Sequence, residues 1–290
     1  MRTSGRRGDA PGVRPALGGT IMDAETLPTL TVRLLGRLEV EACGTPVRLG
    51  GRHAQALAAL LALRPRPRLR DAIAADLWPD FGGPSASSLR QALWLLRNAL
   101  TTAGVDPDAV LDVGPDTLGL RRETRLDVDA TRFEAMVADG PSSSSLALDL
   151  YRGDLAECLG HECFAADRER MSDLYEDALA AAAEQRLAAG DIAGARSAAT
   201  TLLARDPLRE EAHGVLIAVY GVSGSRSQVV RQYRRLGDIL RTELAVRPLP
   251  ETQELYREAL ARSEERSADR ARESREFVRP VLRRVLAPAG

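Results

Sequence analysis

The sequence contains no lysine, because all 40 residues in its Lys and Arg count are arginine. A Walker-A phosphate loop, a protein kinase and a pyridoxal enzyme each need a lysine at the reacting group, so these classes are excluded. The net charge of −1 also excludes a uniformly basic surface. Any nucleic-acid surface must therefore be a local patch.

Cysteines, aromatic residues and long apolar runs are also scarce. Three Cys in 290 residues do not support a disulfide scaffold and fit a reducing cytosol. Aromatic residues make up 4% of the chain, so its cores must be built from Leu, Ala and Val, which favours helices over an all-β fold. No run of 18 apolar residues occurs, and no transmembrane helix is expected. These features predict a mainly α, two-domain cytoplasmic protein without a membrane association.

The two ends of the chain differ from its middle. Residues 1–28 start basic but are broken by Gly and Pro without a following apolar segment, which predicts a disordered segment rather than a signal peptide. Residues 263–290 are dense in both charge signs. We expect a charged tail there, either an exposed helix with i,i+4 ion pairs or a disordered segment.

Residues 29–123 alternate between strand and helix patterns in a defined order. The pattern predicts a strand over 30–40 and a short one over 46–50. Three helices then follow, over 52–63, 69–78 and 85–103, and a β-hairpin over 109–122 turns at Gly-Pro-Asp. This order is typical of a winged helix-turn-helix with a small sheet in front of it.

The third helix, 85–103, has two sides of different chemistry. At 100° per residue its leucines form one stripe: Leu89, Leu93, Leu96 and Leu100. The far side carries Gln91, Trp94, Leu95 and Asn98, and Arg90 and Arg97 share one flank. Arg can bridge phosphates or guanine edges, and Gln and Asn can pair with adenine edges. The helix itself contains no acid that would repel a phosphate.

Two interpretations of this helix stay open on its own sequence. It can be an ordinary amphipathic helix with Trp94 half-buried against a neighbour, or it can enter a DNA groove. The two preceding helices, the hairpin and the Arg pair Arg121 and Arg122 favour DNA contact.

Residues 124–262 are predicted to form an all-α domain. We expect one helix over 126–138, a break at the Gly-Pro-Ser run over 140–145, and helices from 146 to 262. Gly190 and Gly224 are 34 residues apart (224 − 190), which is the tetratricopeptide period. Such repeats present a concave face that can bind a peptide, a ligand or a second subunit.

Other candidate sites are weak. Cys158, His161 and Cys163 lie close together, but a closed zinc site needs four ligands and the spacing is not a standard one. No nucleophile stands beside a plausible base, so we predict neither an enzyme nor a cofactor or metal site. The basic and apolar stretch 233–244 can suggest a membrane or DNA surface, but Asp238 and Glu243 interrupt it and favour a repeat helix.

Two long stretches resemble a known family. "LLGRLEV…GTPVRLGGRHAQALAALLAL…LRDAIAADLWPD…SLRQALWLLRNAL" resembles the OmpR-type winged helix of the SARP antibiotic regulatory proteins. "LDVDATRFEAMVADG…LDLYRGDLAE…FAADRERMSDLYEDALAAAAEQRLAAGDIAGARSAATTLLARDPLREEAHGVLIAVYGVSGSRSQVVRQYRRLGDILRTELAVRPLPETQELYREAL" resembles their bacterial transcriptional activation domain, a tetratricopeptide-like helical module. The resemblance covers about residues 30–262.

The resemblance implies a bacterial transcriptional regulator, usually an activator of a biosynthetic gene cluster. Such proteins bind direct repeats in promoter DNA, act there as homodimers and recruit RNA polymerase. The DNA-contacting residues expected from the helix, the wing and this resemblance are Ser87, Ser88, Arg90, Gln91, Trp94, Arg97, Asn98, Arg121 and Arg122. The loop implied to touch RNA polymerase carries Trp78, Pro79, Asp80 and Phe81.

The sequence also departs from the family pattern. Leu95 stands where the family commonly has Arg, and the wing "GPDTLGL" lacks the usual aromatic after its Gly turn. Several acids lie between Leu30 and Glu123. An adaptor that binds mainly proteins through its helical repeat is therefore the alternative function, and it predicts no salt-dependent DNA affinity.

Overall fold

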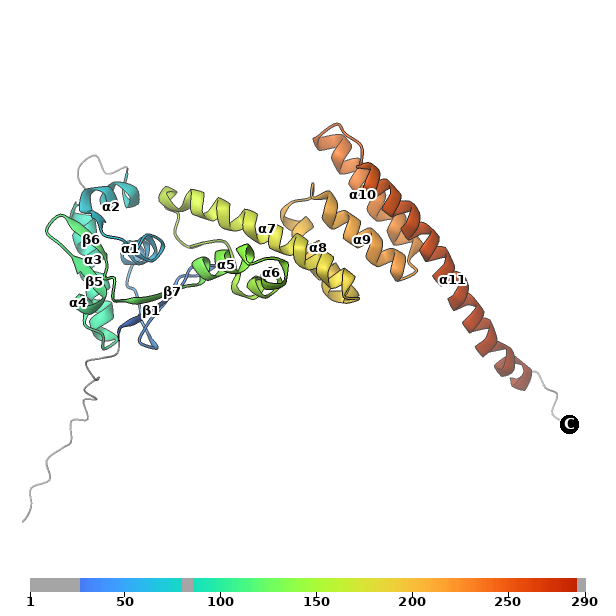
Figure 1. The fold of residues 1–290 in the computed structure, drawn as a ribbon, viewed down its shortest axis with the longest axis horizontal. Helices are drawn as coiled ribbons and strands as arrows, with labels where there is room; N and C mark the ends of the chain where they lie inside the picture. Colours follow the sequence, from blue (N-terminus) through green and yellow to red (C-terminus); the bar gives the residue numbers. More distant parts are fainter. Residues whose placement is uncertain (1–26, 80–85, 286–290) are drawn as a thin grey trace, which may run out of the picture.

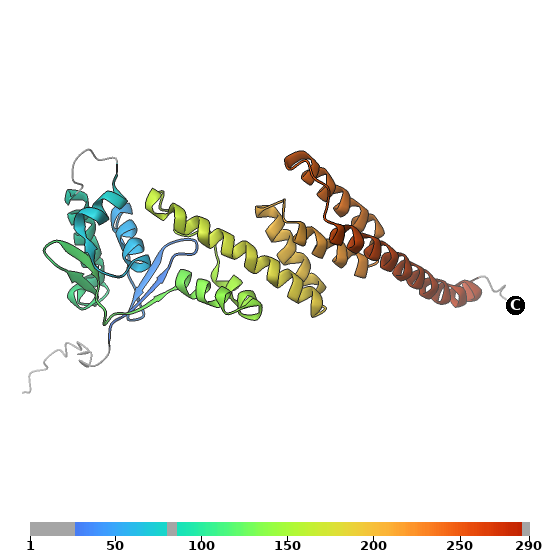
Figure 2. The ribbon, with the colours of Figure 1, turned by 45° about the horizontal axis from the view of Figure 1, so that its top comes forward.

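The computed structural model describes residues 27–79 and 86–285, with side chains for 27–79 and 87–267. The described chain is elongated (Figures 1 and 2), with a small mixed α/β unit at one end and a row of helices leading away from it. No helix in the described part is long and apolar enough to cross a membrane.

The N-terminal sheet has four strands in the order β3-β2-β1-β7. The strands are β1 (Thr29–Arg33), β2 (Glu39–Ala42), β3 (Thr45–Pro46) and β7 (Arg125–Val128). Neighbours are antiparallel except β1 and β7, which run parallel. The expectation of one strand over 30–40 was wrong, because β1 ends at Arg33, the chain turns at Gly36, whose φ of 105° favours glycine, and it returns as β2.

Three helices follow in the order that the sequence predicts: α1 (Arg52–Leu63), α2 (Arg70–Leu77) and α3 (Ala86–Thr102). Helix α1 contacts β7 of this sheet, and α3 packs against α1 and α2. Leu89, Leu93, Leu96 and Leu100 are all buried, which confirms the leucine stripe of α3 as core. The opposite side of α3 is consequently turned away from the protein.

The wing follows α3 through the short helix α4 (Pro107–Val110). Strands β5 (Leu111–Val113) and β6 (Thr117–Leu120) form the predicted hairpin, and β4 (Arg68–Leu69) adds to β6 as a third strand. A Cβ on Gly119 would lie 2.6 Å from the Pro67 Cα. Only glycine therefore lets the segment before α2 approach the wing this closely.

The link between the two halves is a strand rather than a flexible segment. The helix expected over 126–138 begins only at Asp129 as α5 (Asp129–Ala138), because the residues before it pair with β1 as β7. The buried Asp129 carboxylate accepts hydrogen bonds from the amides of Leu34 (2.7 Å) and Leu35 (3.1 Å). One hydrophobic core runs across the junction from Leu30 to Ala178. The division at residues 123 and 124 stays a prediction.

The expected break at 140–145 is a helix instead, α6 (Pro141–Ala147). Gly140, at φ 111°, ends the preceding turn, and Pro141 occupies the first turn of α6, where a missing N–H costs nothing. Burial of Ser144 and Ala147 against neighbouring helices then outweighs the weak helix propensity of the serine run.

The remaining chain is a row of antiparallel helices preceded by two 3-10 turns, η1 (Leu148–Leu150) and η2 (Glu162–Phe164). The helices are α7 (Ala165–Ala188), α8 (Ile192–Arg205), α9 (Glu210–Val222), α10 (Arg226–Glu243) and α11 (Pro250–Val285). Gly190 and Gly224, with φ of 79° and 69°, follow α7 and α9, so each marks the turn inside one helix pair. The tail beyond residue 263 continues α11 as far as its backbone is described.

Candidate nucleic-acid interface

The side of α3 opposite the leucine stripe is exposed. Ser87, Arg90, Gln91, Trp94 and Asn98 all point to solvent, and the Trp94 side chain is 64% exposed. The expectation that Trp94 could be half-buried against a neighbour is therefore wrong. Ser88 is half-buried at the margin of this face.

Arg97 differs from the other polar residues of α3 because it is already paired. Its guanidinium donates two hydrogen bonds to the Asp108 carboxylate, at 2.7 and 2.9 Å. The Arg97 hydrogen bond lowers the pKa of Asp108. Arg97, expected to contact DNA, thus already forms an ion pair with Asp108 of α4 in the same chain. The sequence Asp-Pro-Asp after α3 signals only the end of a helix, so Asp108 was missed.

Two arginines follow the wing at its base. Arg121 and Arg122 are both exposed. The Arg121 Nε donates to the backbone carbonyl of Asp108, which ties the wing to α4. Arg122 follows it in the sequence and is exposed as well, and the expected contact of this pair with a DNA backbone stays a prediction.

A hollow of about 400 Å³ joins α3 to the wing turn. Its walls come from α2, α3 and the turn between β5 and β6, and its lining residues are Leu69, Arg70, Asp71, Ala74, Leu89, Arg90, Pro115 and Asp116. The Arg70 amide donates to the Asp116 carbonyl at 2.9 Å, which holds the wing turn against α2. Arg90 and the wing turn consequently belong to one surface.

The expected polymerase-contacting loop is only partly described. The Trp78 side chain is 6% exposed and stacks on His53 with ring centroids 5.1 Å apart, so it is a core residue and not a surface contact. Pro79 is exposed, whereas Asp80 and Phe81 lie outside the described residues. Leu95 is half-buried, so it lies at the edge of the core and not fully on the outer face.

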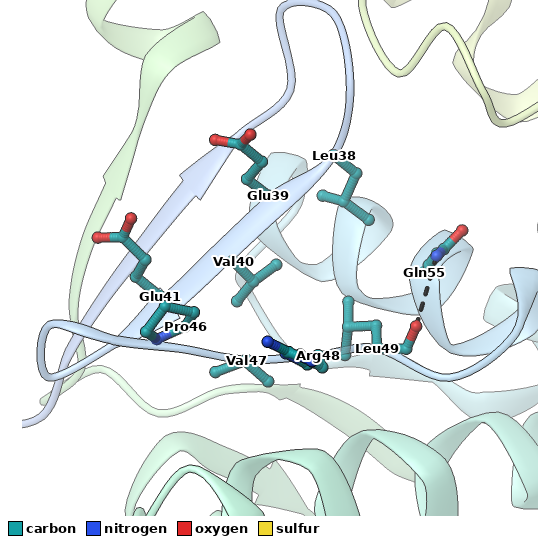
Figure 3. A pocket seen from close by; sticks show the side chains of 9 residues that line it. All are labelled: Leu38, Glu39, Val40, Glu41, Pro46, Val47, Arg48, Leu49 and Gln55. Carbon is teal, nitrogen blue, oxygen red and sulfur yellow. Dashed lines mark hydrogen bonds between the residues drawn. The ribbon is translucent and has the colours of Figure 1, made fainter.

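A second hollow, of about 430 Å³, lies between β2, the segment after β3 and α1 (Figure 3). Leu38, Val40, Val47 and Leu49 give it an apolar floor, and the Gln55 side chain donates to the Leu49 carbonyl at 3.4 Å. Glu39 and Glu41 both lie within 4 Å of Arg33, at 2.9 and 3.9 Å. The hollow thus presents carboxylates that are already paired, and not an acid, base and nucleophile together.

The histidines and cysteines are spread over the fold. In the part of the chain that the structure describes, no three His, Cys, Asp or Glu residues gather into a set that could hold a metal ion. Cys158 is exposed and Cys163 is half-buried. The buried His213 ring joins the Pro207 carbonyl (3.1 Å) to the Gln232 side chain (2.8 Å), and burial lowers its pKa. His213 is therefore a neutral structural residue that connects α9 to α10.

Comparison with known proteins agrees with this architecture. Residues 128–260 match the model of the bacterial transcriptional activator domain. The transcriptional regulatory protein EmbR of Mycobacterium tuberculosis is 30% identical over 234 residues, covering 75% of this chain and 60% of EmbR. The transcriptional regulatory protein MoaR1 of the same organism is 29% identical over 259 residues, covering 83% of this chain and 82% of MoaR1.

A solved structure is similar over most of the fold. Mycobacterium tuberculosis EmbR, in complex with a low affinity phosphopeptide, has a TM-score of 0.67 and 26% identity, covering 87% of this chain and 71% of that one. The chain spans 60% of the length of the EmbR relatives that it matches. The winged helix, the match to the bacterial transcriptional activator domain at residues 128–260 and these relatives together support a transcriptional regulator of the SARP type.

Proposed function

We propose that this regulator reads promoter DNA by placing the outer face of α3 in the major groove, with the wing arginines on the adjacent phosphates. The observation that carries the proposal is the exposure of Trp94, 64%, on a helix whose opposite side is fully packed. A large exposed aromatic side chain next to Arg90, Gln91 and Asn98 is costly to leave in water. A DNA groove would cover it.

Each side chain on this face has a defined task in the proposal. Arg90 pairs with a guanine edge or a phosphate, Gln91 and Asn98 pair with adenine edges, and Trp94 contacts thymine methyl groups or sugars. Ser87 and Ser88, at the start of α3, donate to phosphates. Arg121 and Arg122 fix the wing on the backbone through charge, without reading sequence.

Arg97 joins this interface only after Asp108 releases it. In the structure two of its N–H groups are held by a bidentate carboxylate, which is the same geometry that a phosphate offers. A phosphate that approaches α3 near Arg97 therefore competes with Asp108. The proposal assigns Arg97 a conditional contact and Arg90 a constant one.

The wider role follows from the family. We propose that the chain acts as an activator of a biosynthetic gene cluster in the bacterial cytoplasm, binding direct promoter repeats as a homodimer and recruiting RNA polymerase. On this proposal the loop after α2, from Pro79 onward, is the segment that faces the polymerase. Trp78 serves that loop only by anchoring its start in the core.

The test is binding of the purified full chain to a fluorescent duplex of its own upstream region, at low and physiological salt. We expect Arg90→Ala to weaken binding about tenfold, because a good Arg contact to a base contributes about 1–3 kcal/mol. Arg196→Ala removes an exposed arginine from α8 and serves as the matched control, with affinity unchanged. Affinity must also fall steeply with salt.

A protein adaptor is the second candidate, and the Arg97–Asp108 pair favours it, because this pair removes a cation from the α3 face. The same titration separates the two functions. A folded chain that shows no DNA affinity at low salt, or equal affinity for Arg90→Ala, would reject the groove contact and favour the adaptor.

A further inference from the structure

The loop between α10 and α11, residues 244–249, is unusually apolar for an exposed loop. Among the described residues it contributes three of the seven exposed large hydrophobic side chains: Leu244 at 53%, Val246 at 49% and Leu249 at 56%. It lies in the row of helices, well away from α3, at the top of the molecule in Figures 1 and 2. Exposed apolar side chains gathered in one short segment mark an interaction surface.

A hollow of about 490 Å³ separates this loop from α10. Its lining residues are Tyr233, Arg234, Gly237, Asp238, Arg241, Ala245, Val246, Arg247 and Pro248. Gly237 lies on its α10 side, and a Cβ added there would meet no atom within 4 Å. The hollow is therefore open directly above the glycine, so a side chain from outside can enter it.

The rim of the hollow is positively charged. Three arginines line it, Arg234, Arg241 and Arg247, against a single acid, Asp238. Arg241 donates to Asp238 at 2.8 Å, so that carboxylate is already paired. Arg234 and Arg247 are both exposed, the first on α10 and the second on the loop. Guanidinium groups in such positions bind carboxylates in a bidentate manner.

We propose that this α10–α11 hollow docks an acidic peptide segment of another protein through one apolar anchor side chain. The anchor fills the space above Gly237 against Val246 and Pro248, and flanking Asp or Glu residues pair with Arg234 and Arg247. This combination of a central apolar anchor and charged flanks is a common mode of peptide recognition. The proposal does not depend on the DNA contacts of α3.

Charge complementarity and the apolar loop favour an acidic peptide over two other occupants. Interfaces with DNA are strongly polar and basic. A DNA contact here would bury the apolar side chains of Leu244, Val246 and Leu249 in such an interface. A symmetric contact with a second copy would bring the same patch against itself, and arginines would then face arginines.

The experiment titrates a short fluorescein-labelled peptide with the protein and measures the fluorescence anisotropy of the peptide. The peptide carries acidic residues on both sides of a Leu-Phe pair. Two matched peptides replace the acids by Lys or the Leu-Phe pair by Ser-Ser. We expect the acidic peptide to bind, both matched peptides to bind at least about tenfold more weakly, and binding to weaken with salt.

Two variants locate the binding. Arg234→Glu/Arg247→Glu reverses the rim charge, and Gly237→Leu fills the hollow; each should weaken peptide binding at least about tenfold. Arg196→Glu on α8 is the matched control for charge, and its affinity should equal that of the unaltered chain. Circular dichroism and the urea unfolding midpoint report whether each variant keeps its fold.

Several results would overturn the proposal. Equal peptide affinity of the folded charge-reversal variant, or no binding of the acidic peptide at low salt, would do so. Loss of affinity for vesicles of anionic phosphatidylglycerol in the charge-reversal variant, with no peptide binding, would assign the patch to a membrane surface. A change of oligomeric mass in Gly237→Leu, measured by sedimentation without peptide binding, would assign it to a second copy.

Discussion

The two halves of the described chain are built on different packing principles. From Leu30 to Ala178 one continuous core joins the sheet, α1 to α3, the wing, α5, α6 and the first half of α7. Beyond it the helices rest on two smaller clusters, the last of which contains only Ile217, Val229 and Ala259 as buried members. One half is thus held from many directions and the other mainly by neighbouring helices.

This difference determines how far a local defect spreads in each half of the described chain. In the first half a local defect is felt throughout, because each element contacts several others through one core. In the second half each helix pair depends mostly on its immediate neighbours, as in repeat proteins. The surface that we assign to DNA belongs to the first half, and the peptide hollow belongs to the second.

The largest expected effect is at the junction. Asp129→Ala leaves the buried amides of Leu34 and Leu35 without an acceptor, and we expect it to lower the free energy of unfolding by about 2–4 kcal/mol. A urea titration monitored by near-UV circular dichroism should still show a single unfolding transition for the first half. Asp127→Ala breaks an exposed pair with Arg132 and should cost less than about 1 kcal/mol. Equal effects of the two variants would refute the shared junction.

The next effect is confined to the repeat half. A Cβ at Gly221 would lie 2.8 Å from the Ala259 Cβ, so Gly221→Ala forces α9 and α11 apart. We expect a loss of about 1–2 kcal/mol, visible in hydrogen exchange as earlier opening of α11 alone. Gly237→Ala, which meets no neighbour, should instead stabilise α10 by about 0.5–1 kcal/mol. Opening that spreads to α1 and α3 would contradict the division into two packing regimes.

Acid should act on the same half through His213. Burial lowers its pKa in the folded chain, so the unfolded chain binds the proton first and stability falls as the pH drops below about 6.5. The slope is at most about 1.4 kcal/mol per pH unit for one proton. Urea midpoints of the unaltered chain and of His213→Asn, compared at neutral and mildly acidic pH, test this. A variant with an unchanged pH slope would exclude His213 as the cause.

The smallest effect concerns binding and leaves stability nearly unchanged. Asp108→Ala removes a carboxylate beside the α3 surface and frees Arg97, and we expect DNA affinity to rise about fivefold, because the carboxylate no longer repels phosphates at short range. Asp108→Ala/Arg97→Ala should lose much of this gain. Anisotropy with the upstream duplex measures both, and a fall in affinity for Asp108→Ala would show that the pair positions Arg97.

The sequence predicted the helices and turns that are determined by residues close to one another in the chain. The bounds of α1 and α3 and the leucine stripe follow from helical periodicity, from Pro65 after α1 and from Gly104 after α3. The turns at Gly190 and Gly224 follow from the repeat period. These features need no knowledge of what packs against them.

The errors arise where distant residues decide. The run at 140–145 forms α6 because Ser144 and Ala147 are buried by helices elsewhere in the chain. The residues before Asp129 form β7 because β1 offers a free edge. At the candidate site, the partner of Arg97 likewise depends on tertiary contacts. Sequence periodicity does not contain this information.

The parallel strand β7, which leaves the sheet directly into α5, has a mechanical consequence. Because no loop separates β7 from α5, the helical row keeps a fixed orientation relative to the winged helix. For a chain bound to DNA through α3, the far end of the helical row would therefore point in one direction around the duplex axis. Moving the binding site by half a helical turn, about five base pairs, would then carry the α10–α11 hollow to the opposite side of the DNA.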